Sequence, residues 1–161
     1  MLSIQPLTGR HDRNAFESAS AQLDAWLRHT ARQHQRRAIS KTFVAVSEEE
    51  PARILGFYAL TACEILTEEL PEDLAKKLPR KIPGIRLGRL AVDRSVQGRG
   101  LGAHLLMDAI ERARGVLEQV GVHALFVDAK DERAAAFYSK YGFRPLPGDP
   151  LRLVLPLAGL P

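Results

Sequence analysis

The chain has 161 residues, of which 45% are hydrophobic and 26% are charged, and we expect residues 1–161 to form a single globular domain. Its apolar runs are too short to cross a bilayer, and its N-terminus lacks a basic segment followed by an apolar one. We therefore expect a soluble, cytoplasmic protein with no membrane partner. Because Cys63 is its only cysteine and its five histidines show no metal-ligand spacing, an internal disulfide is excluded and we expect no metal.

The formal net charge of +4 is modest, but the basic residues lie in two clusters. The first falls between Arg28 and Lys41, and the second between Lys76 and Arg89. Such clusters suit a polyanionic partner. The alternative is that both are solvated helix faces, and composition leaves the two interpretations open.

The first half of the chain predicts a helix followed by a hairpin. Apolar residues at helical spacing indicate a helix from Ser20 to Arg37, capped by Ser18 or Ser20. Its arginines at positions 28, 32 and 36 are four apart, so we expect them on one exposed stripe. Residues 42–46 and 54–63 are then predicted to be two strands joined by a polar turn.

The second half alternates helices and strands. A short helix between Thr67 and Pro83, with Pro71 in its first turn, precedes a strand from Ile85 to Val92. A long helix with an apolar stripe from Leu101 to Val120 should begin near Gly100 and end at Gly121. The remaining elements are predicted to be a strand at 123–129, a helix at 131–141 closed by Gly142, and short strands at 143–146 and 151–157.

The strands at Ile85 and His123 flank one helix, so we expect them to be parallel neighbours. The front hairpin and the last two strands make the sheet mixed. The fold class is therefore α/β or α+β, with a ligand expected at the C-terminal edge of the parallel pair.

The segment from Arg89 to Gly102 reads R-L-A-V-D-R-S-V-Q-G-R-G-L-G and places a strand, a glycine-rich turn and a helix start in succession. The first N–H groups of a helix have no intrahelical acceptor, and the helix dipole adds partial positive charge there. Such a turn is suited to a phosphate or pyrophosphate. The alternative is that the glycines only serve the geometry of a tight strand-to-helix turn.

Two motifs in this sequence resemble the GCN5-related N-acetyltransferase (GNAT) family. Gln97, Gly100 and Gly102 match Q/R-x-x-G-x-G/A, the loop that binds the acyl-CoA pyrophosphate, and residues 134–143 match A-x-x-F-Y-x-K-x-G-F. The resemblance implies the GNAT fold, a mixed central sheet with helices on both faces and a parallel strand pair that splays to hold acetyl-CoA. Carried onto this chain, it implies coenzyme contacts at Leu90, Ala91, Val92, Gln97, Gly98, Arg99, Gly100, Leu101, Gly102, Ala103, Asp131, Ala135, Phe137 and Tyr138.

The same resemblance makes Tyr138 the candidate catalytic residue, because the family uses this tyrosine to hold or protonate the coenzyme A sulfur. A phenol with a pKa near 10 stays protonated at neutral pH and can donate to a leaving thiolate. Main-chain N–H groups at Leu90 to Val92 are candidates for polarising the thioester carbonyl. For Phe137, core packing on the same helix face is the simpler explanation.

The residues leave more than one acceptor amine open. A lysine amine needs a dedicated base at neutral pH, whereas an α-amino group with a pKa near 8 needs less help. Glu64 and Asp128 are candidate bases, and both are better explained as structural carboxylates. A site without a strong base would suit a weakly basic amine.

The resemblance extends over nearly the whole chain to the acetyltransferase toxins of toxin–antitoxin pairs. It rests on L-D-x-W-L with a basic helix, T-F-V-A-V, G-R-L-A-V-D, Q-G-R-G-L-G, V-D-A-K-D and F-Y-S-K-Y-G-F; at Phe16–Ser20 the chain reads F-E-S-A-S, where that group often has a turn containing cysteine or glycine. It implies acetylation of the α-amino group of aminoacyl-tRNA, a ribbon-helix-helix antitoxin as partner, and it leaves a homodimer open. The implied tRNA contacts are Arg28, Arg32, Arg36, Arg37, Arg86 and Arg89.

Two other functions stay open at this stage. The same chemistry on a small-molecule amine or a protein amino group would need no basic surface for tRNA. A non-catalytic acyl-CoA-binding module would keep the glycine turn without transferring an acetyl group.

Overall fold

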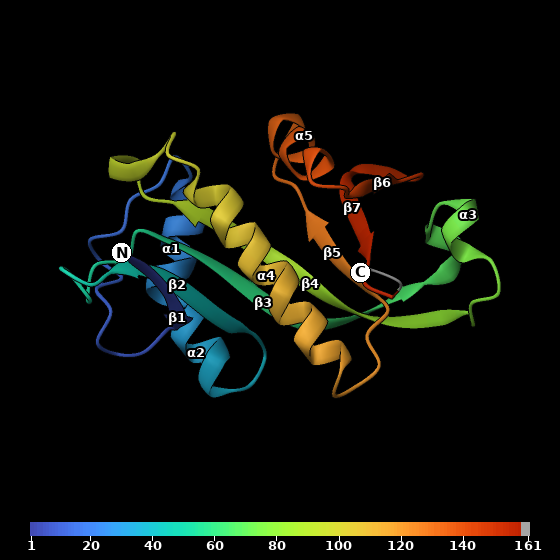
Figure 1. Ribbon diagram of the computed structural model, residues 1–161, viewed down its shortest axis with the longest axis horizontal. Helices are drawn as coiled ribbons and strands as arrows, with labels where there is room; N and C mark the ends of the chain where they lie inside the picture. The colour runs from blue at the N-terminus through green and yellow to red at the C-terminus, as the bar shows by residue number, and fades with distance from the viewer. Residues whose placement is uncertain (159–161) are drawn as a thin grey trace. The chain divides into compact units, whose positions relative to one another are not determined.

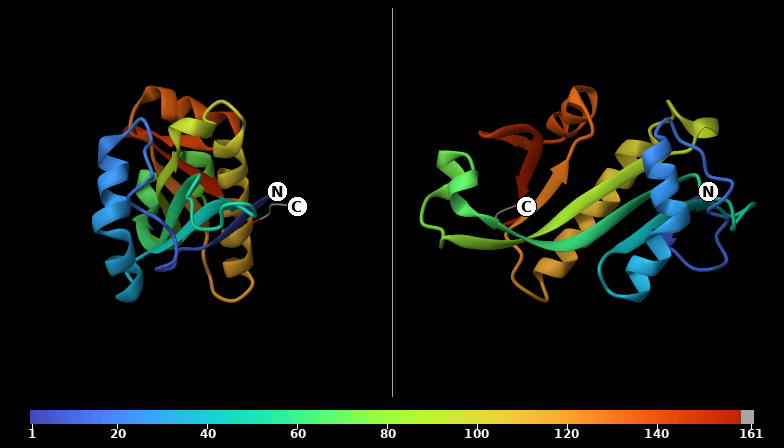
Figure 2. Two further views of the ribbon diagram at one scale, coloured as in Figure 1. Left: turned by 90° about the vertical axis from the view of Figure 1, so that its left-hand side faces the viewer. Right: turned by 180° about the vertical axis from the view of Figure 1, so that it is seen from behind.

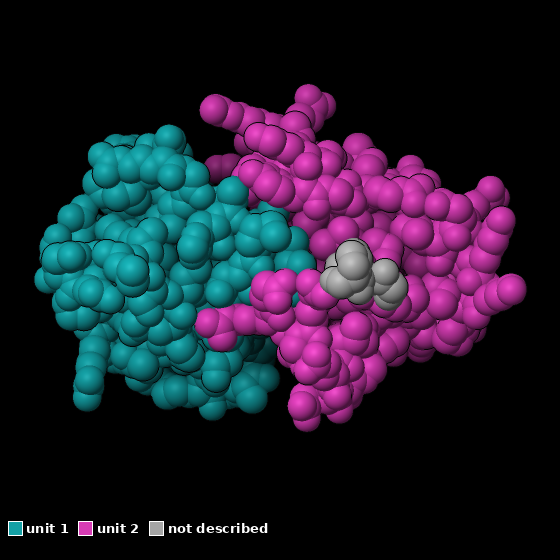
Figure 3. Space-filling view, in the orientation of Figure 1, with its two compact units in different colours: residues 1–61, 88–110 teal, residues 62–87, 111–161 magenta. Residues whose placement is uncertain are grey.

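The computed structural model describes residues 1–158, and Figure 1 labels its helices and strands. The chain divides into two compact units, residues 1–61 with 88–110 and residues 62–87 with 111–161, which Figure 3 colours separately. Strands β3 (Gly56–Leu66) and β4 (Lys81–Val92) and helix α4 (Leu101–Leu117) each run from one unit into the other.

The strands of the described residues are hydrogen-bonded in the order β1-β2-β3-β4-β5-β7-β6, in one mixed sheet. β4 and β5 (Ala124–Asp128) pair in parallel and are connected through α4. The pairs β1–β2, β2–β3, β5–β7 and β6–β7 are antiparallel. The predicted mixed α/β architecture, with a parallel strand pair connected through the long helix, is confirmed.

In the first unit, β1 (Leu2–Pro6), β2 (Lys41–Ser47) and the start of β3 carry helices on both faces, as Figure 2 shows in its left view. Phe57 on β3 points to the side of α1 (Ala21–His29), where it stacks on Trp26. The neighbouring Gly56 faces α4, because a Cβ there would lie 2.8 Å from the Leu105 side chain. Alternation along β3 therefore buries one set of residues under each helical layer.

The helix predicted from Ser20 to Arg37 is in fact two helices. α1 is capped by Ser20, whose side chain accepts the Leu23 N–H, and α2 covers Ala31–Arg36. Thr30 separates them, with φ −123° and ψ −38°. Thr30 is β-branched, and residues with two heavy atoms on Cβ are poor helix formers, so a break at this position is locally inexpensive.

In the second unit, β5 lies between β4 and β7 (Asp149–Pro156), and β7 also pairs with β6 (Arg144–Leu146). One face packs a core that includes Phe126 and Val154 against Leu74 of α3 (Glu72–Ala75). Helix α5 (Glu132–Lys140) lies on β7, and Gly142 just after it is close to Leu155. Since Val154 and Leu155 point to opposite faces of β7, α3 and α5 cover opposite faces of this unit.

Several elements differ from the predictions; for example, β4 begins at Lys81 rather than at Ile85. The predicted helix after Thr67 is a 3-10 turn, η1 (Thr67–Glu69), followed by the short helix α3. Leu70 is extended, as is usual before a proline, and this separates the two. Pro71 is the N-cap of α3 rather than a residue of its first turn. Helix α4 ends at Leu117 rather than at Gly121, and Val120 is 59% exposed, so no burial stabilises another turn. Strand β1 was not predicted, because this short edge strand buries little: three of its five residues are exposed.

Candidate functional site

The strand end at Gly88–Val92 is the first part of the candidate site. The parallel register with β5 covers Gly84–Leu87. β4 continues to Val92, and within the described residues its last five positions have no register partner on β5. This is the feature that a splayed pair requires, because it leaves main-chain groups of β4 available to a ligand. Of the three predicted contacts here, Ala91 is buried, and Leu90 and Val92 are half-buried.

The glycine turn follows directly. A short 3-10 turn, η2 (Arg94–Val96), leads into Gly98 with φ +78° and Gly100 with φ +82°. These are left-handed conformations that favour glycine, and a Cβ at either position would meet nothing within 4 Å. Both glycines are thus required by the backbone, and the space beside them is open. The Gln97 amide donates to the Val92 carbonyl oxygen at 3.1 Å and ties the turn to the strand end.

Helix α4 begins at Leu101, and its first hydrogen bond joins the His104 N–H to the Gly100 carbonyl at 3.1 Å. The N–H groups of Leu101, Gly102 and Ala103 precede that bond and point out of the helix start. Arg99 is exposed beside them. A groove of about 290 Å³ is lined by Arg99, Gly100 and His104 together with the apolar residues Leu2, Leu55, Val96 and Leu101. The aligned N–H groups, the dipole and the guanidinium make this turn suitable for a pyrophosphate.

Tyr138 lies on α5 in the second unit and is the buried residue of that helix. Its ring packs edge-on against Phe137 and Phe143 at 5.3 and 5.7 Å between ring centroids. Burial raises the pKa of the Tyr138 phenol to about 12, and no hydrogen bond to its hydroxyl is found among the described residues. The phenol is therefore neutral at physiological pH and has a proton to donate.

The other predicted coenzyme residues of α5 also have local roles. Asp131 is the N-cap, because its carboxylate accepts the Ala134 N–H at 2.8 Å. Ala135 and Phe137 are half-buried, and Phe137 contacts both Tyr138 and Tyr141 edge-on. Core packing, the simpler explanation for Phe137, agrees with these contacts.

The two carboxylates considered as bases are both in ion pairs. Glu64 lies 3.8 Å from the Lys81 ammonium, and both side chains are largely exposed. Asp128 lies 3.5 Å from Arg86 and 3.6 Å from Arg152. These contacts agree with a structural role for both carboxylates.

The six arginines expected to bind tRNA differ in exposure and in their contacts. Arg36 and Arg37 are exposed on α2 and at its end, whereas Arg28 and Arg32 are half-buried, so the predicted stripe of Arg28, Arg32 and Arg36 is only partly exposed. The break at Thr30 and the packing of Leu27 and Ala31 account for the difference. Arg89 packs over Trp26, and Arg86, in the second unit, pairs with Asp128.

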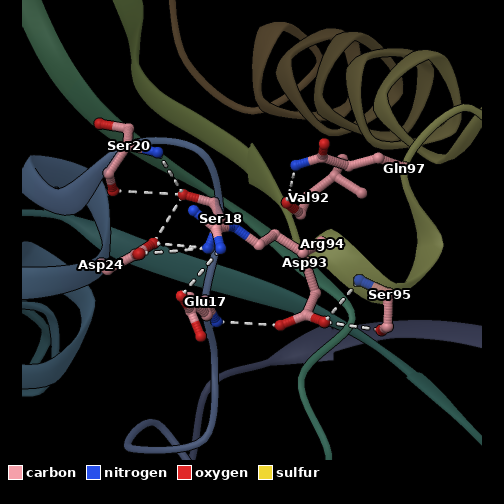
Figure 4. Close-up of polar contacts among 9 residues, drawn as sticks. All are labelled: Glu17, Ser18, Ser20, Asp24, Val92, Asp93, Arg94, Ser95 and Gln97. Atoms are coloured by element: carbon pink, nitrogen blue, oxygen red, sulfur yellow. Dashed lines mark hydrogen bonds and ion pairs between the residues drawn. The ribbon is translucent and has the colours of Figure 1, made fainter.

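Sequence reasoning missed a set of buried carboxylates in the first unit, which Figure 4 shows. Asp24 is buried and accepts the Ser18 N–H and, at 2.6 Å, the Ser18 hydroxyl. Asp93 is buried and accepts the Glu17 N–H at 2.9 Å. The available signal was the serine-rich turn F-E-S-A-S followed by an aspartate in the first turn of a helix.

Within residues 1–158, no group of three or more side chains is arranged to hold a metal ion, and no helix is long and apolar enough to cross a membrane.

Comparison with known proteins gives a consistent set of relatives. Residues 38–145 match the family described as "Acetyltransferase (GNAT) domain". A "tRNA-acetylating toxin" of Mycobacterium tuberculosis is 39% identical over 144 residues, which cover 89% of this chain and 85% of the relative.

Solved structures resemble the chain over almost its full length. "AtaT complexed with acetyl-methionyl-tRNAfMet" superposes with a TM-score of 0.91 at 33% identity, covering 97% of this chain and 95% of that one. A tyrosine-to-phenylalanine mutant of the AtaT toxin, bound to the C-terminus of the antitoxin AtaR and acetyl-CoA, has a TM-score of 0.82 at 29% identity and covers 98% of this chain and 94% of that one.

Proposed function

The chain belongs to the GNAT family of acetyltransferases, and we propose that it transfers acetyl from acetyl-CoA to the α-amino group of aminoacyl-tRNA and thereby inhibits translation. The observation that carries the proposal is the likeness, over 97% of the chain, to a toxin whose structure contains acetyl-methionyl-tRNA. The unpaired end of β4 and the open glycine turn agree with it, because they supply the main-chain donors that an acyl-CoA needs.

In this proposal different residues bind different parts of acetyl-CoA. The N–H groups from Gln97 to Ala103 and the side chain of Arg99 bind the pyrophosphate, and main-chain groups of Leu90 to Val92 bind the acyl arm. Asp131, Ala135 and Phe137 support the binding from α5. Acetyl-CoA supplies a thioester, whose carbonyl carbon is attacked by the amine and whose sulfur leaves as a thiolate.

The proposed chemistry asks two things of the protein. N–H groups at the end of β4 donate to the carbonyl oxygen as it gains negative charge. Tyr138 donates its proton to the departing sulfur, which its raised pKa of about 12 permits because the phenol is never ionised at neutral pH. An α-amino group with a pKa of about 8 is already neutral in roughly one molecule in ten at pH 7, so the site needs no strong base.

We also propose the partners and organisation that accompany this activity. The exposed guanidinium groups of Arg36 and Arg37 contact tRNA phosphates, and an antitoxin with a ribbon-helix-helix DNA-binding part holds the enzyme inactive in the cytoplasm. Support for the antitoxin is the AtaT structure bound to the C-terminus of AtaR. The GNAT match at residues 38–145 includes parts of both units, which supports a single domain over residues 1–161, and a homodimer is part of the same proposal.

The test is transfer of radiolabelled acetyl from acetyl-CoA to total aminoacylated tRNA. We expect label that is released with the amino acid on alkaline hydrolysis of the ester, and no label on deacylated tRNA. Tyr138→Phe should abolish transfer while the protein stays folded. Rapid acetylation of a polyamine or a protein amino group, without label on charged tRNA, would contradict the proposed acceptor.

A further inference from the structure

Asp93 stands at the junction between β4 and the glycine turn, five residues before Gly98. Its side chain is 10% exposed, and Figure 4 shows it between two separate stretches of chain. A buried carboxylate needs hydrogen-bond donors, because burial without them is costly. Its donors come from both stretches.

On the side of the turn, one carboxylate oxygen accepts the Ser95 N–H at 3.1 Å and the Ser95 hydroxyl at 2.6 Å. This makes Asp93 the N-cap of η2. The Asp93 N–H itself donates to the carbonyl oxygen of Leu55, the residue just before β3, at 2.8 Å. The path of the chain into Gly98 and Gly100 is therefore anchored at its first residue.

On the other side, the second carboxylate oxygen accepts the Glu17 N–H at 2.9 Å. The Arg94 N–H donates to the Glu17 carbonyl oxygen at 2.8 Å, so Glu17 is held through both of its main-chain groups. The next residue, Ser18, is held by Asp24 from α1. The loop Phe16–Ser20 is thus fixed to the strand end at Asp93 and Arg94.

The charge of Asp93 is stabilised mainly by these hydrogen bonds. Arg53 is the nearby cation, with its guanidinium 3.9 Å from the carboxylate and donating to the Ser95 hydroxyl oxygen at 2.7 Å. Burial alone would raise the pKa of Asp93, but the donors from Glu17 and Ser95, with Arg53, outweigh it and hold the pKa below its usual range. The carboxylate is therefore ionised at neutral pH and makes charge-assisted bonds, which are strong and directional.

We infer that Asp93 is a positioning residue that holds the coenzyme turn and the loop Phe16–Ser20 in one fixed arrangement, so that acetyl-CoA affinity depends on its carboxylate. The inference rests on the proposed function, in which the turn binds the pyrophosphate. Gly98 and Gly100 have no side chains to restrict them, so an unanchored turn would lose conformational entropy on binding. Anchoring at Asp93 removes part of that cost before acetyl-CoA arrives.

The experiment measures the dissociation constant of acetyl-CoA by calorimetry. The parent protein is the full chain carrying Tyr138→Phe, which is expected to be inactive and therefore not toxic to the expression host. Asp93→Asn keeps the shape but replaces one acceptor oxygen by an NH2 group that faces N–H donors. We expect it to raise the dissociation constant about tenfold or more. Ser95→Ala removes the hydroxyl that donates to Asp93 and accepts from Arg53, but keeps the Ser95 N–H. It should give a smaller rise, which keeps the inference testable if Asp93→Asn does not fold.

Two controls separate positioning from general stability. Val44→Ala removes buried methyl groups from β2 in the same unit, so it should lower the melting temperature and leave the dissociation constant unchanged. Glu17→Ala removes the exposed ion pair with Arg94 but keeps the N–H that Asp93 binds, and it should change neither. In the active chain, Asp93→Asn should raise the KM for acetyl-CoA and leave kcat at saturation nearly unchanged.

Unchanged affinity in both Asp93→Asn and Ser95→Ala, with a parent that binds, would overturn the inference and leave the proposed function intact. Equal weakening by Val44→Ala would also overturn it, because loss of stability would then be the cause. A Tyr138→Phe parent that does not bind acetyl-CoA at all would instead contradict the coenzyme site of the proposed function.

Discussion

The guanidinium carbon of Arg89 lies 4.3 Å from the centre of the Trp26 ring. Trp26 also stacks on Phe57 at 6.2 Å, and Arg89 is sufficiently desolvated that burial lowers its pKa. A guanidinium packed on an indole in this way joins β4 to α1 within the first unit. Arg89 therefore has a structural role in the first unit, packed on Trp26. Arg36 and Arg37, by contrast, are exposed at the end of α2.

Arg89→Ala should lower the free energy of unfolding by about 1 to 2 kcal/mol, through the lost cation–π contact and the lost packing of the side-chain stem. Arg89→Lys should recover only part of this, because an ammonium lacks the planar face. Urea denaturation measures both. Arg36→Ala is the matched control and should stay within about 0.5 kcal/mol of the parent; an equal loss there would contradict a special role for Arg89.

Charge reversal of Arg36 and Arg37 together should weaken acetylation of aminoacyl-tRNA without changing the fold. If each arginine neutralises one phosphate, the slope of log affinity against log salt becomes shallower by about one per residue. The measurement is tRNA binding at several salt concentrations. Acetyl-CoA affinity of the same variant is the internal control, and a salt slope that does not change would exclude these residues from the tRNA contact.

The pKa of Tyr138, raised to about 12 by burial, predicts a specific pH dependence of stability. An unfolded tyrosine ionises near pH 10, so the stability that the buried neutral phenol contributes is fully present below about pH 10 and is lost as pH rises through about 12. Alkaline titration by the ultraviolet absorbance of tyrosinate should show one late component that is missing in Tyr138→Phe. If that component titrates near pH 10, the phenol is more exposed than the structure indicates.

Gly100→Ala should weaken acetyl-CoA binding and cost about 1 kcal/mol of stability, because φ of +82° is strained for a residue with a Cβ. Gly115→Ala in α4 is the control. A Cβ there meets nothing within 4 Å, so the substitution should stabilise the helix by about 0.5 to 1 kcal/mol and leave binding unchanged. Thermal unfolding with and without acetyl-CoA separates the two effects, since only the ligand-dependent shift should differ.

Several features were predictable because their signals are local. The apolar strand, the glycines and the periodic helix from β4 to α4 are consecutive in sequence, and the capping residue Asp131 and the terminating Gly142 bracket α5. The resemblance to the GNAT family used the same short motifs. Helix ends were predicted less well, as at Thr30 and Leu117, because burial rather than propensity decides where a helix ends.

By itself, the sequence determined the strand–turn–helix that suits a pyrophosphate, the position of Tyr138 on a capped helix, and the mixed sheet. Only the tertiary structure decided that the Glu17 N–H meets the Asp93 carboxylate across 76 positions of chain, and that Arg89 packs on Trp26 rather than standing free. The physical reason is that glycine geometry, capping and periodicity act between near neighbours. A hydrogen bond or ring contact between distant segments forms only after burial has brought them together, and it has no periodic trace in the sequence.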